Sequence, residues 1–211
     1  MGDSHAGHLQ GMLNRLHRGT GAGIHLIETP SRPYPYAGPT FEPRERILSA
    51  VYEHARPGDM VLVSRLFLQP NSEQVMAGLD AWMVSLKALA QELQTRQMHL
   101  VVVGPPPMFD FEHPVVCKRT VFSNAACAQD RKAQALRMEQ VSQSLERTLA
   151  PEPNAHVFRS FDILCPATGS TCTPVHGGTM IYRDRDHLNT AGAALLAEVR
   201  RAPAYATLAD N

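Results

Sequence analysis

The stretch HLVVVGPPP, residues 99–107, is a continuously apolar run that ends in a glycine and three prolines. A second run of this kind, DMVLVSRLFL at 59–68, precedes it, and the amphipathic segment 71–97 lies between the two. Apolar strands that do not alternate with polar residues, separated by a helix, are typical of a parallel sheet covered on both faces. The sequence therefore predicts a three-layer α/β/α architecture around a parallel sheet.

The same alternation continues on both sides of this unit. Helical spacing predicts helices at 4–19, 43–58, 131–150 and 188–202, and apolar runs predict further strands at 23–29 and 155–164. We find no internal repeat and no linker, so the chain is expected to form a single domain over residues 1–211.

Composition excludes several classes of function. The formal net charge is zero and the basic residues form no run, so a nucleic-acid partner is not expected. No apolar stretch is long enough to span a bilayer, and the N-terminus lacks the pattern of a secretory signal. The four cysteines, however, form two local pairs, Cys117 with Cys127 and Cys165 with Cys172, which favours disulfides and an oxidising compartment.

Two short motifs near the ends of the chain suggest chemistry. Ser4 follows Gly2-Asp3 at the expected start of a helix, where backbone N–H groups and the helix dipole would stabilise an oxyanion. Considered by itself, a serine at this position is more often an ordinary helix cap. Asp184 and His187 are three residues apart before the last helix, so the carboxylate can reach Nδ1 and leave Nε2 to accept a serine proton.

Four motifs carry a resemblance to a known family: GDSHAGHL at the start, DMVLVSR, DILCP followed by a second cysteine, and YRDRDHLNTAGA near the end. Together they resemble the SGNH (GDSL-like) hydrolase superfamily, and more narrowly the SGNH domain attached to membrane acyltransferase-3 proteins, which O-acetylate bacterial surface glycans. The resemblance implies an SGNH/flavodoxin-like fold with Ser4 as nucleophile, His187 as general base and Asp184 as its orienting carboxylate. Asp186 is the less favoured partner of His187.

The resemblance also implies the surroundings of the reaction. It implies a glycan acceptor, an acyl donor, a membrane acyltransferase domain in a longer parent protein, the periplasmic side of the inner membrane, and no cofactor. The backbone N–H of Ser4 would be one oxyanion donor. An esterase that acts on carbohydrates or lipids, and a non-catalytic remnant that at most binds glycans, remain alternatives.

Two departures from the family pattern matter. The family's Gly-x-Asn block is replaced by Gly104-Pro105-Pro106, so the asparagine that donates to the oxyanion is missing. Gly104 and Arg65 are the candidate substitutes at the oxyanion or substrate site, although Arg65 could instead form a surface ion pair. Only Met1 precedes Gly2-Asp3-Ser4, so the first core strand of the family fold is expected to be missing and the chain to be a fragment.

Metal sites are considered and not favoured. His5 and His8 are one helical turn apart and could ligate a metal together with His187 or Asp186, but no Cys-x-x-Cys supports them. A zinc site at Cys165, Cys172 and His176 would lack a fourth ligand. No metal is therefore expected, and His8 is expected to face solvent or pack on a loop.

Overall fold

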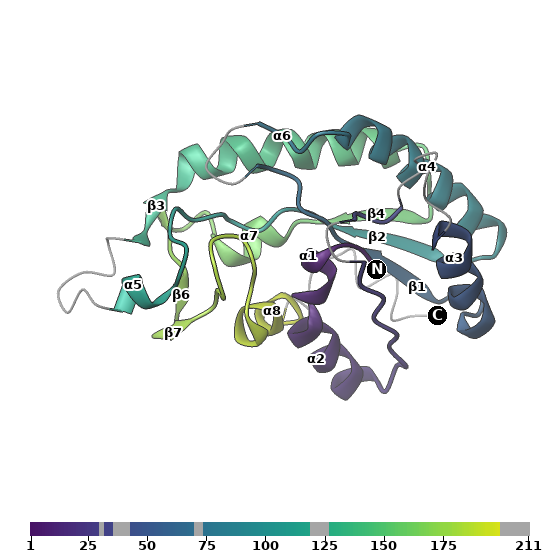
Figure 1. Ribbon diagram of the computed structural model, residues 1–211, viewed down its shortest axis with the longest axis horizontal. Coiled ribbons are helices and arrows are strands. Elements are labelled where there is room, and N and C mark those ends of the chain that lie inside the picture. Colours follow the sequence, from purple (N-terminus) through teal and green to yellow (C-terminus); the bar gives the residue numbers. More distant parts are fainter. Residues whose placement is uncertain (30–31, 36–42, 70–73, 119–126, 199–211) are drawn as a thin grey trace.

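A computed structural model describes residues 1–29, 32–35, 43–69, 74–118 and 127–198 of the chain. Its centre is a parallel three-stranded sheet with the order β1-β2-β4, formed by β1 (Met60–Val63), β2 (His99–Val103) and β4 (Ala155–Phe158). The register places Leu62 opposite Val101 and Val102 opposite Val157. The predicted parallel sheet is confirmed (Figure 1).

Helices lie on both sides of this sheet. The long helices α4 (Leu79–Thr95) and α6 (Arg131–Leu149) cover one face, and α2 (Gln10–Thr20) and α8 (Thr190–Leu196) lie together on the opposite side (Figure 1). Apolar side chains fill the space between α4 and the strands, and the fully buried ones include Trp82, Leu86, Leu89, Leu93, Leu100 and Val102. The three-layer arrangement is thus built on the periodicity seen in the sequence.

Close approach of α2 to α8 depends on a glycine. A side chain at Gly11 would place its Cβ 2.1 Å from the backbone oxygen of Thr190 at the start of α8. Real Cβ atoms do not approach that closely, so only glycine lets the two helices meet here. This contact brings the beginning and the end of the described chain to the same side of the sheet.

Shorter elements complete the described part of the chain. They are α1 (Ser4–Gly7), α3 (Pro43–His54), α5 (Val115–Lys118), α7 (Ser160–Leu164), and the two-residue strands β3 (Gln129–Asp130), β5 (Thr171–Cys172), β6 (Val175–His176) and β7 (Thr179–Met180). Strands β3 and β5 pair antiparallel, as do β6 and β7.

Both predicted disulfides are present. Cys117 in α5 is bonded to Cys127, and Cys165 at the end of α7 is bonded to Cys172 in β5. Each bridge closes a short loop, with sequence separations of 10 and 7 residues. The local pairing inferred from the cysteine spacing is therefore confirmed.

The residues before α1 pair with the end of β1. The backbone of Met1 and Gly2 pairs with the end of β1, because Ser64 N–H donates to the Met1 carbonyl at 3.1 Å. Gly2 also bridges to Glu28 on its other side. Gly2 thus lies between the end of β1 and Glu28.

The strand predicted at 23–29 is wrong. Apart from the bridge at Glu28, no pairing is described for this segment, and Ile24 and Leu26 are 37% and 39% exposed. A strand is stable only when a neighbour satisfies its backbone groups. In the described part of the chain, that neighbour is limited to Gly2, which bridges to Glu28.

Other predicted boundaries also differ from the structure. The first helix is split, because α1 ends at Gly7 and α2 begins at Gln10. The strand predicted at 155–164 ends at Phe158 and is followed by α7, whose Ser160 hydroxyl donates to the carbonyl of Gly104 at 2.7 Å. The last helix is described to Leu196, and its predicted end at 202 lies outside the described residues.

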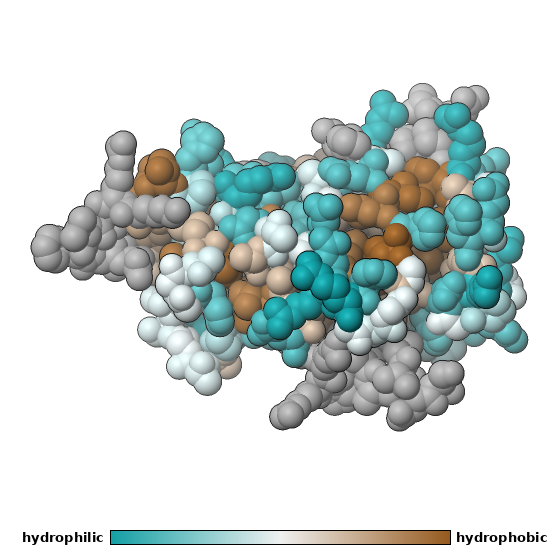
Figure 2. All heavy atoms as spheres, turned by 90° about the horizontal axis from the view of Figure 1, so that it is seen from below, coloured by the Kyte–Doolittle hydropathy of each residue, from teal (hydrophilic) through white to brown (hydrophobic). Residues whose placement is uncertain are grey.

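Apolar surface remains on the side opposite α4 and α6. Figure 2 shows this face, and its apolar atoms gather on the right, on the side where Figure 1 places the strands. Met60 and Leu62 of β1 are only partly buried. None of the helices in the described ranges is both long enough and apolar enough to cross a membrane.

Candidate active site

The end of β1 and the start of α1 are joined through Asp3. One carboxylate oxygen of Asp3 accepts the backbone N–H of His5 at 2.9 Å and caps α1, and the other accepts the backbone N–H of Leu66 at 3.0 Å. Gly2 allows the chain to come this close, because a Cβ there would lie 1.8 Å from the Ser64 oxygen and its φ is +149°. Gly2 and Asp3 therefore fix Ser4 beside the end of the sheet.

Ser4 meets His187 although the two are far apart in sequence. The Ser4 hydroxyl oxygen lies 2.8 Å from Nε2 of His187. Nδ1 of the same ring lies 2.9 Å and 3.0 Å from the two carboxylate oxygens of Asp184. A carboxylate only accepts, so Nδ1 carries the proton, and Nε2 is left to accept the hydroxyl proton of Ser4. The three residues have the geometry of a catalytic triad.

The charges at this site favour an active base. Burial lowers the pKa of His187, but the hydrogen bonds and negative charges of Asp186 and Asp184 outweigh burial and raise it above its ordinary value. Burial raises the pKa of Asp184, but hydrogen bonds from the backbone and side chain of His187 bring it down to about 2. Asp184 is thus ionised whenever His187 acts as a base.

Asp186 lies closer to His187 than its position in the sequence suggested. Its Oδ1 is 3.4 Å from Nδ1 of His187, whereas Asp184 approaches to 2.9 Å. The expectation that Asp186 points away from the ring is not met, although Asp184 has the shorter contact. Asp186 is also more buried than Asp184, with side-chain exposures of 9% and 32%.

Two further histidines pack against the triad. The ring centroids of His5 and His187 are 4.6 Å apart, and those of His5 and His8 are 4.9 Å apart. His8 is buried, and its Nδ1 accepts the backbone N–H of Leu188 at 3.3 Å. Burial is the largest cause that lowers the pKa of His8 well below its ordinary value. Of the two alternatives predicted for His8, exposure to solvent is wrong, and packing against a loop agrees with its contact to Leu188.

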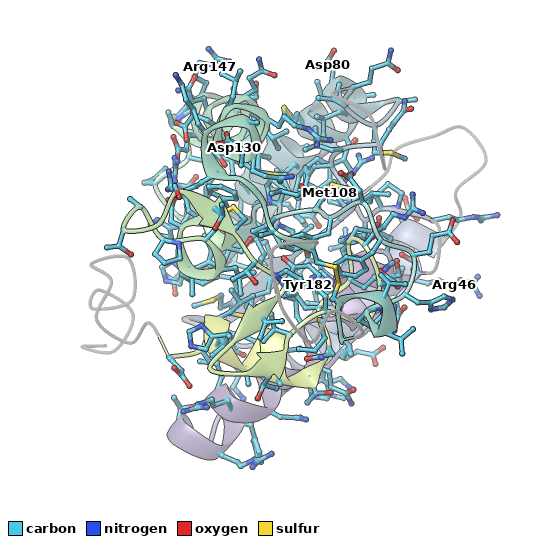
Figure 3. The ribbon with its side chains drawn as sticks, turned by 90° about the vertical axis from the view of Figure 1, so that its left-hand side faces the viewer. Arg46, Asp80, Met108, Asp130, Arg147 and Tyr182 are labelled. Carbon is cyan, nitrogen blue, oxygen red and sulfur yellow. A yellow bond between two sulfur atoms is a disulfide. The ribbon has the colours of Figure 1, made fainter. Side chains whose placement is uncertain are left out.

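The turn that carries Asp184 and His187 is held from several directions. The hydroxyl of Tyr182 donates to the carbonyl of Pro107 at 2.8 Å, and Phe109 N–H donates to the carbonyl of Arg185 at 2.8 Å. Figure 3 shows Tyr182 and Met108 near the middle of that view. Asn189 caps α8 by accepting the N–H of Gly192 at 2.9 Å. The loop after β2 and the cap of α8 thus position the base.

The two candidate oxyanion or substrate residues, Gly104 and Arg65, both already have partners within the fold. Gly104 N–H donates to the carbonyl of Phe158 at 2.9 Å, so the sheet already uses this donor. Arg65 is buried, its Nε donates to the carbonyl of Leu66 at 2.9 Å, and its guanidinium carbon lies 5.1 Å from the ring centre of Trp82. The alternative in which Arg65 forms a surface ion pair does not fit this burial.

One trio of side chains could hold a metal ion among the residues that the structure describes. The ligand atoms of His5, Asp186 and His187 lie within 4.8 Å of one another. Both nitrogens of His187 already have partners, however, and a metal would have to displace Asp184 or Ser4. The zinc site considered at Cys165 and Cys172 does not fit, because a disulfide offers no thiolate ligand.

Sequence reasoning did not find the contact between His5 and Asp186. His5 Nε2 lies 3.6 Å from Oδ2 of Asp186, and both side chains are at most 9% exposed. The sequence suggested His5 and Asp186 together only as possible metal ligands, and each of these residues directly follows or precedes a triad residue. Such adjacency cannot show that the two neighbours meet across the fold.

Comparisons with known proteins agree with this geometry. Residues 1–201 match the family model of the SGNH domain that is fused to AT3 domains. The fold is similar to that of a lipopolysaccharide acetyltransferase periplasmic domain from Salmonella ser. Paratyphi A, with a TM-score of 0.63 and 13% identity over 94% of this chain and 79% of that chain.

A more distant solved structure is that of a "putative platelet activating factor" from Streptococcus pneumonia. It has a TM-score of 0.40 and 10% identity over 74% of this chain and 90% of that chain, so no argument rests on it. A comparison with curated protein sequences finds no match.

Proposed function

The chain belongs to the family of SGNH domains fused to AT3 domains, whose members are hydrolases or acyltransferases, and we propose that it transfers an acyl group, through Ser4, to a hydroxyl of a bacterial cell-surface glycan. The observation that carries this proposal is the 2.8 Å contact between the Ser4 hydroxyl and Nε2 of His187, with Asp184 on the other ring nitrogen. A serine with a base and an oriented tautomer is what acyl transfer requires.

The proposed first half-reaction forms an acyl-enzyme. Nε2 of His187 takes the proton of Ser4 as Oγ bonds to the acyl carbonyl carbon of the donor. The bond between that carbon and the donor's leaving atom breaks, and the leaving atom receives the proton from His187. Asp184 stabilises the positively charged imidazole in between. The backbone N–H of Ser4 is the proposed donor to the oxyanion.

In the second half-reaction a sugar hydroxyl attacks the acyl group. His187 takes its proton, the bond from the carbonyl carbon to the Ser4 oxygen breaks, and His187 returns the proton to Ser4. Fusion to AT3 domains in the family supports a membrane acyltransferase domain as the source of the acyl group. The likeness to a lipopolysaccharide acetyltransferase periplasmic domain supports an acetyl group, a glycan acceptor and a periplasmic location.

The proposal is tested by trapping the acyl group. The full chain is incubated with an activated acetyl ester, and peptides are analysed by mass spectrometry. We expect an acetyl adduct on Ser4, and its absence in Ser4→Ala. The control is Ser170→Ala, which removes an exposed serine away from the triad and keeps the adduct.

The acceptor is tested in the same reaction. Addition of a candidate oligosaccharide should transfer the acetyl group from Ser4 to the sugar. An esterase would instead release acetate to water at the same rate with and without the oligosaccharide. If Ser4 carries no adduct and Ser4→Ala loses no activity, the catalytic role of Ser4 is wrong.

A further inference from the structure

A buried row of ionisable side chains lies beneath the triad. His5 has one ring nitrogen facing each of two carboxylates: Nδ1 is 3.5 Å from Oδ1 of Asp3, and Nε2 is 3.6 Å from Oδ2 of Asp186. The other oxygen of Asp186 is 3.4 Å from Nδ1 of His187. The side chains of His5, Asp3 and Asp186 are 2%, 9% and 9% exposed, so little water screens these contacts.

We propose that His5 is a positioning residue that holds Asp186 against His187, so that two carboxylates rather than one support the charge on the catalytic imidazole. The inference rests on the proposed function only in giving His187 the role of general base. The geometry is specific, because Asp186 has one oxygen on each of the two histidines.

The division of work between the carboxylates follows from their contacts. Asp184 Oδ1 accepts the backbone N–H of His187 at 2.9 Å and the N–H of Asp186 at 3.2 Å, so the turn itself fixes Asp184. For Asp186, the ring of His5 on α1 supplies a contact from outside the turn. A buried carboxylate needs such a partner, since an unpaired one is costly. The contact with His5 thus holds the carboxylate of Asp186 close to His187.

Several other groups face His187 and have to be kept constant. Ser4 and His8 approach it from the N-terminal segment, and Arg183 and Asp184 lie on its own turn. Asp3 lies behind His5, and Tyr182 is buried near Asp186. None of these groups is changed in the variants below.

The chain offers a matched pair of variants at His5. In His5→Gln the amide nitrogen can occupy the place of Nε2 and keep the contact with Asp186. In His5→Asn the shorter side chain can only occupy the place of Nδ1, so it keeps a polar group beside Asp3 and loses Asp186. In both variants Asp3 still accepts the backbone N–H of residue 5, and thermal unfolding checks that both fold.

The readout is the titration midpoint of His187, measured by NMR on the full chain with labelled histidine and assigned with His187→Gln. Asp186→Asn should lower this midpoint by roughly one pH unit, because a nearby negative charge is lost. His5→Asn should lower it part of the way toward the Asp186→Asn value, because Asp186 is then no longer held against His187. His5→Gln should leave it close to that of the unmodified protein.

A double-mutant cycle decides whether His5 acts through Asp186. In the Asp186→Asn background, His5→Asn should no longer move the midpoint. An equal shift in both backgrounds, equal midpoints for His5→Asn and His5→Gln, or an unchanged midpoint in Asp186→Asn would overturn the inference. The titration needs no turnover, so it gives its answer even if the acyl-trapping experiment fails.

Discussion

The Ser4 hydroxyl lies 2.8 Å from Nε2 of His187, which is 183 positions further along the chain. Both residues sit at the same side of the sheet because α2 and α8, the helices that follow them, pack against each other through Gly11. The site is therefore assembled by the two ends of the described chain. Its chemistry and its stability should respond to changes in either end.

Asp184 and Asp186 should differ in their effect on activity. Asp184→Asn removes the acceptor that fixes the proton on Nδ1, so the wrong tautomer forms and kcat should fall by about 10³-fold or more. Asp186→Asn leaves that acceptor in place and should cost roughly tenfold. Steady-state kinetics with an activated ester compares the two. Equal losses would mean that Asp184 is not the single orienting carboxylate.

The rate should depend on pH through His187. Because its pKa is raised above the ordinary value of 6.5, the neutral base forms only at a higher pH than for a free imidazole. We expect kcat/KM for an activated ester to rise with pH, with a midpoint above 6.5. In Asp186→Asn the midpoint should move down. A profile that is flat from pH 5 to pH 9 would contradict a histidine base.

Acid should weaken the turn that carries Asp184. The folded-state pKa of Asp184 is about 2, below its ordinary value of 3.8, so its contribution to stability is present above about pH 4 and is lost as the pH falls toward 2. Urea unfolding at several pH values measures this slope. Asp184→Asn should show a shallower loss of stability over that range, and identical slopes would contradict the contribution of Asp184.

Gly2 should be intolerant of any side chain. Gly2→Ala forces a Cβ to within 1.8 Å of the Ser64 oxygen at a φ of +149°, which should cost about 2 kcal/mol or more of unfolding free energy. The control is Gly23→Ala, where a Cβ meets no atom within 4 Å. Thermal unfolding of the two variants should separate them clearly, and equal melting temperatures would show that this close approach is not needed.

The disulfide between Cys165 and Cys172 should stabilise the region between α7 and the triad turn. It closes a loop with a sequence separation of 7, for which chain entropy predicts about 2–3 kcal/mol. Replacing both cysteines by serine should lower the melting temperature without removing Ser4 acylation. Thiol counting on denatured, unreduced protein made in an oxidising compartment should find no free thiol, and four free thiols would contradict both bridges.

The sequence by itself determined the features that depend on short separations. Apolar runs and helical periodicity predicted β1, β2, α4 and α6, because burial on both faces selects those patterns directly. The contact between Asp184 and His187 spans one turn, and the cysteine pairs are 10 and 7 residues apart, so their spacing was enough. The predicted strand at 23–29 failed because a strand depends on a neighbour that its own residues do not encode.

Only the tertiary structure decided which distant groups meet. It showed that the Gly104 N–H is used by β4, that Arg65 is buried against Trp82, and that His5 contacts Asp186. These contacts depend on how helices and loops from both ends of the chain pack against one sheet. Their distances are fixed by the close packing of the whole core rather than by any local pattern of residues.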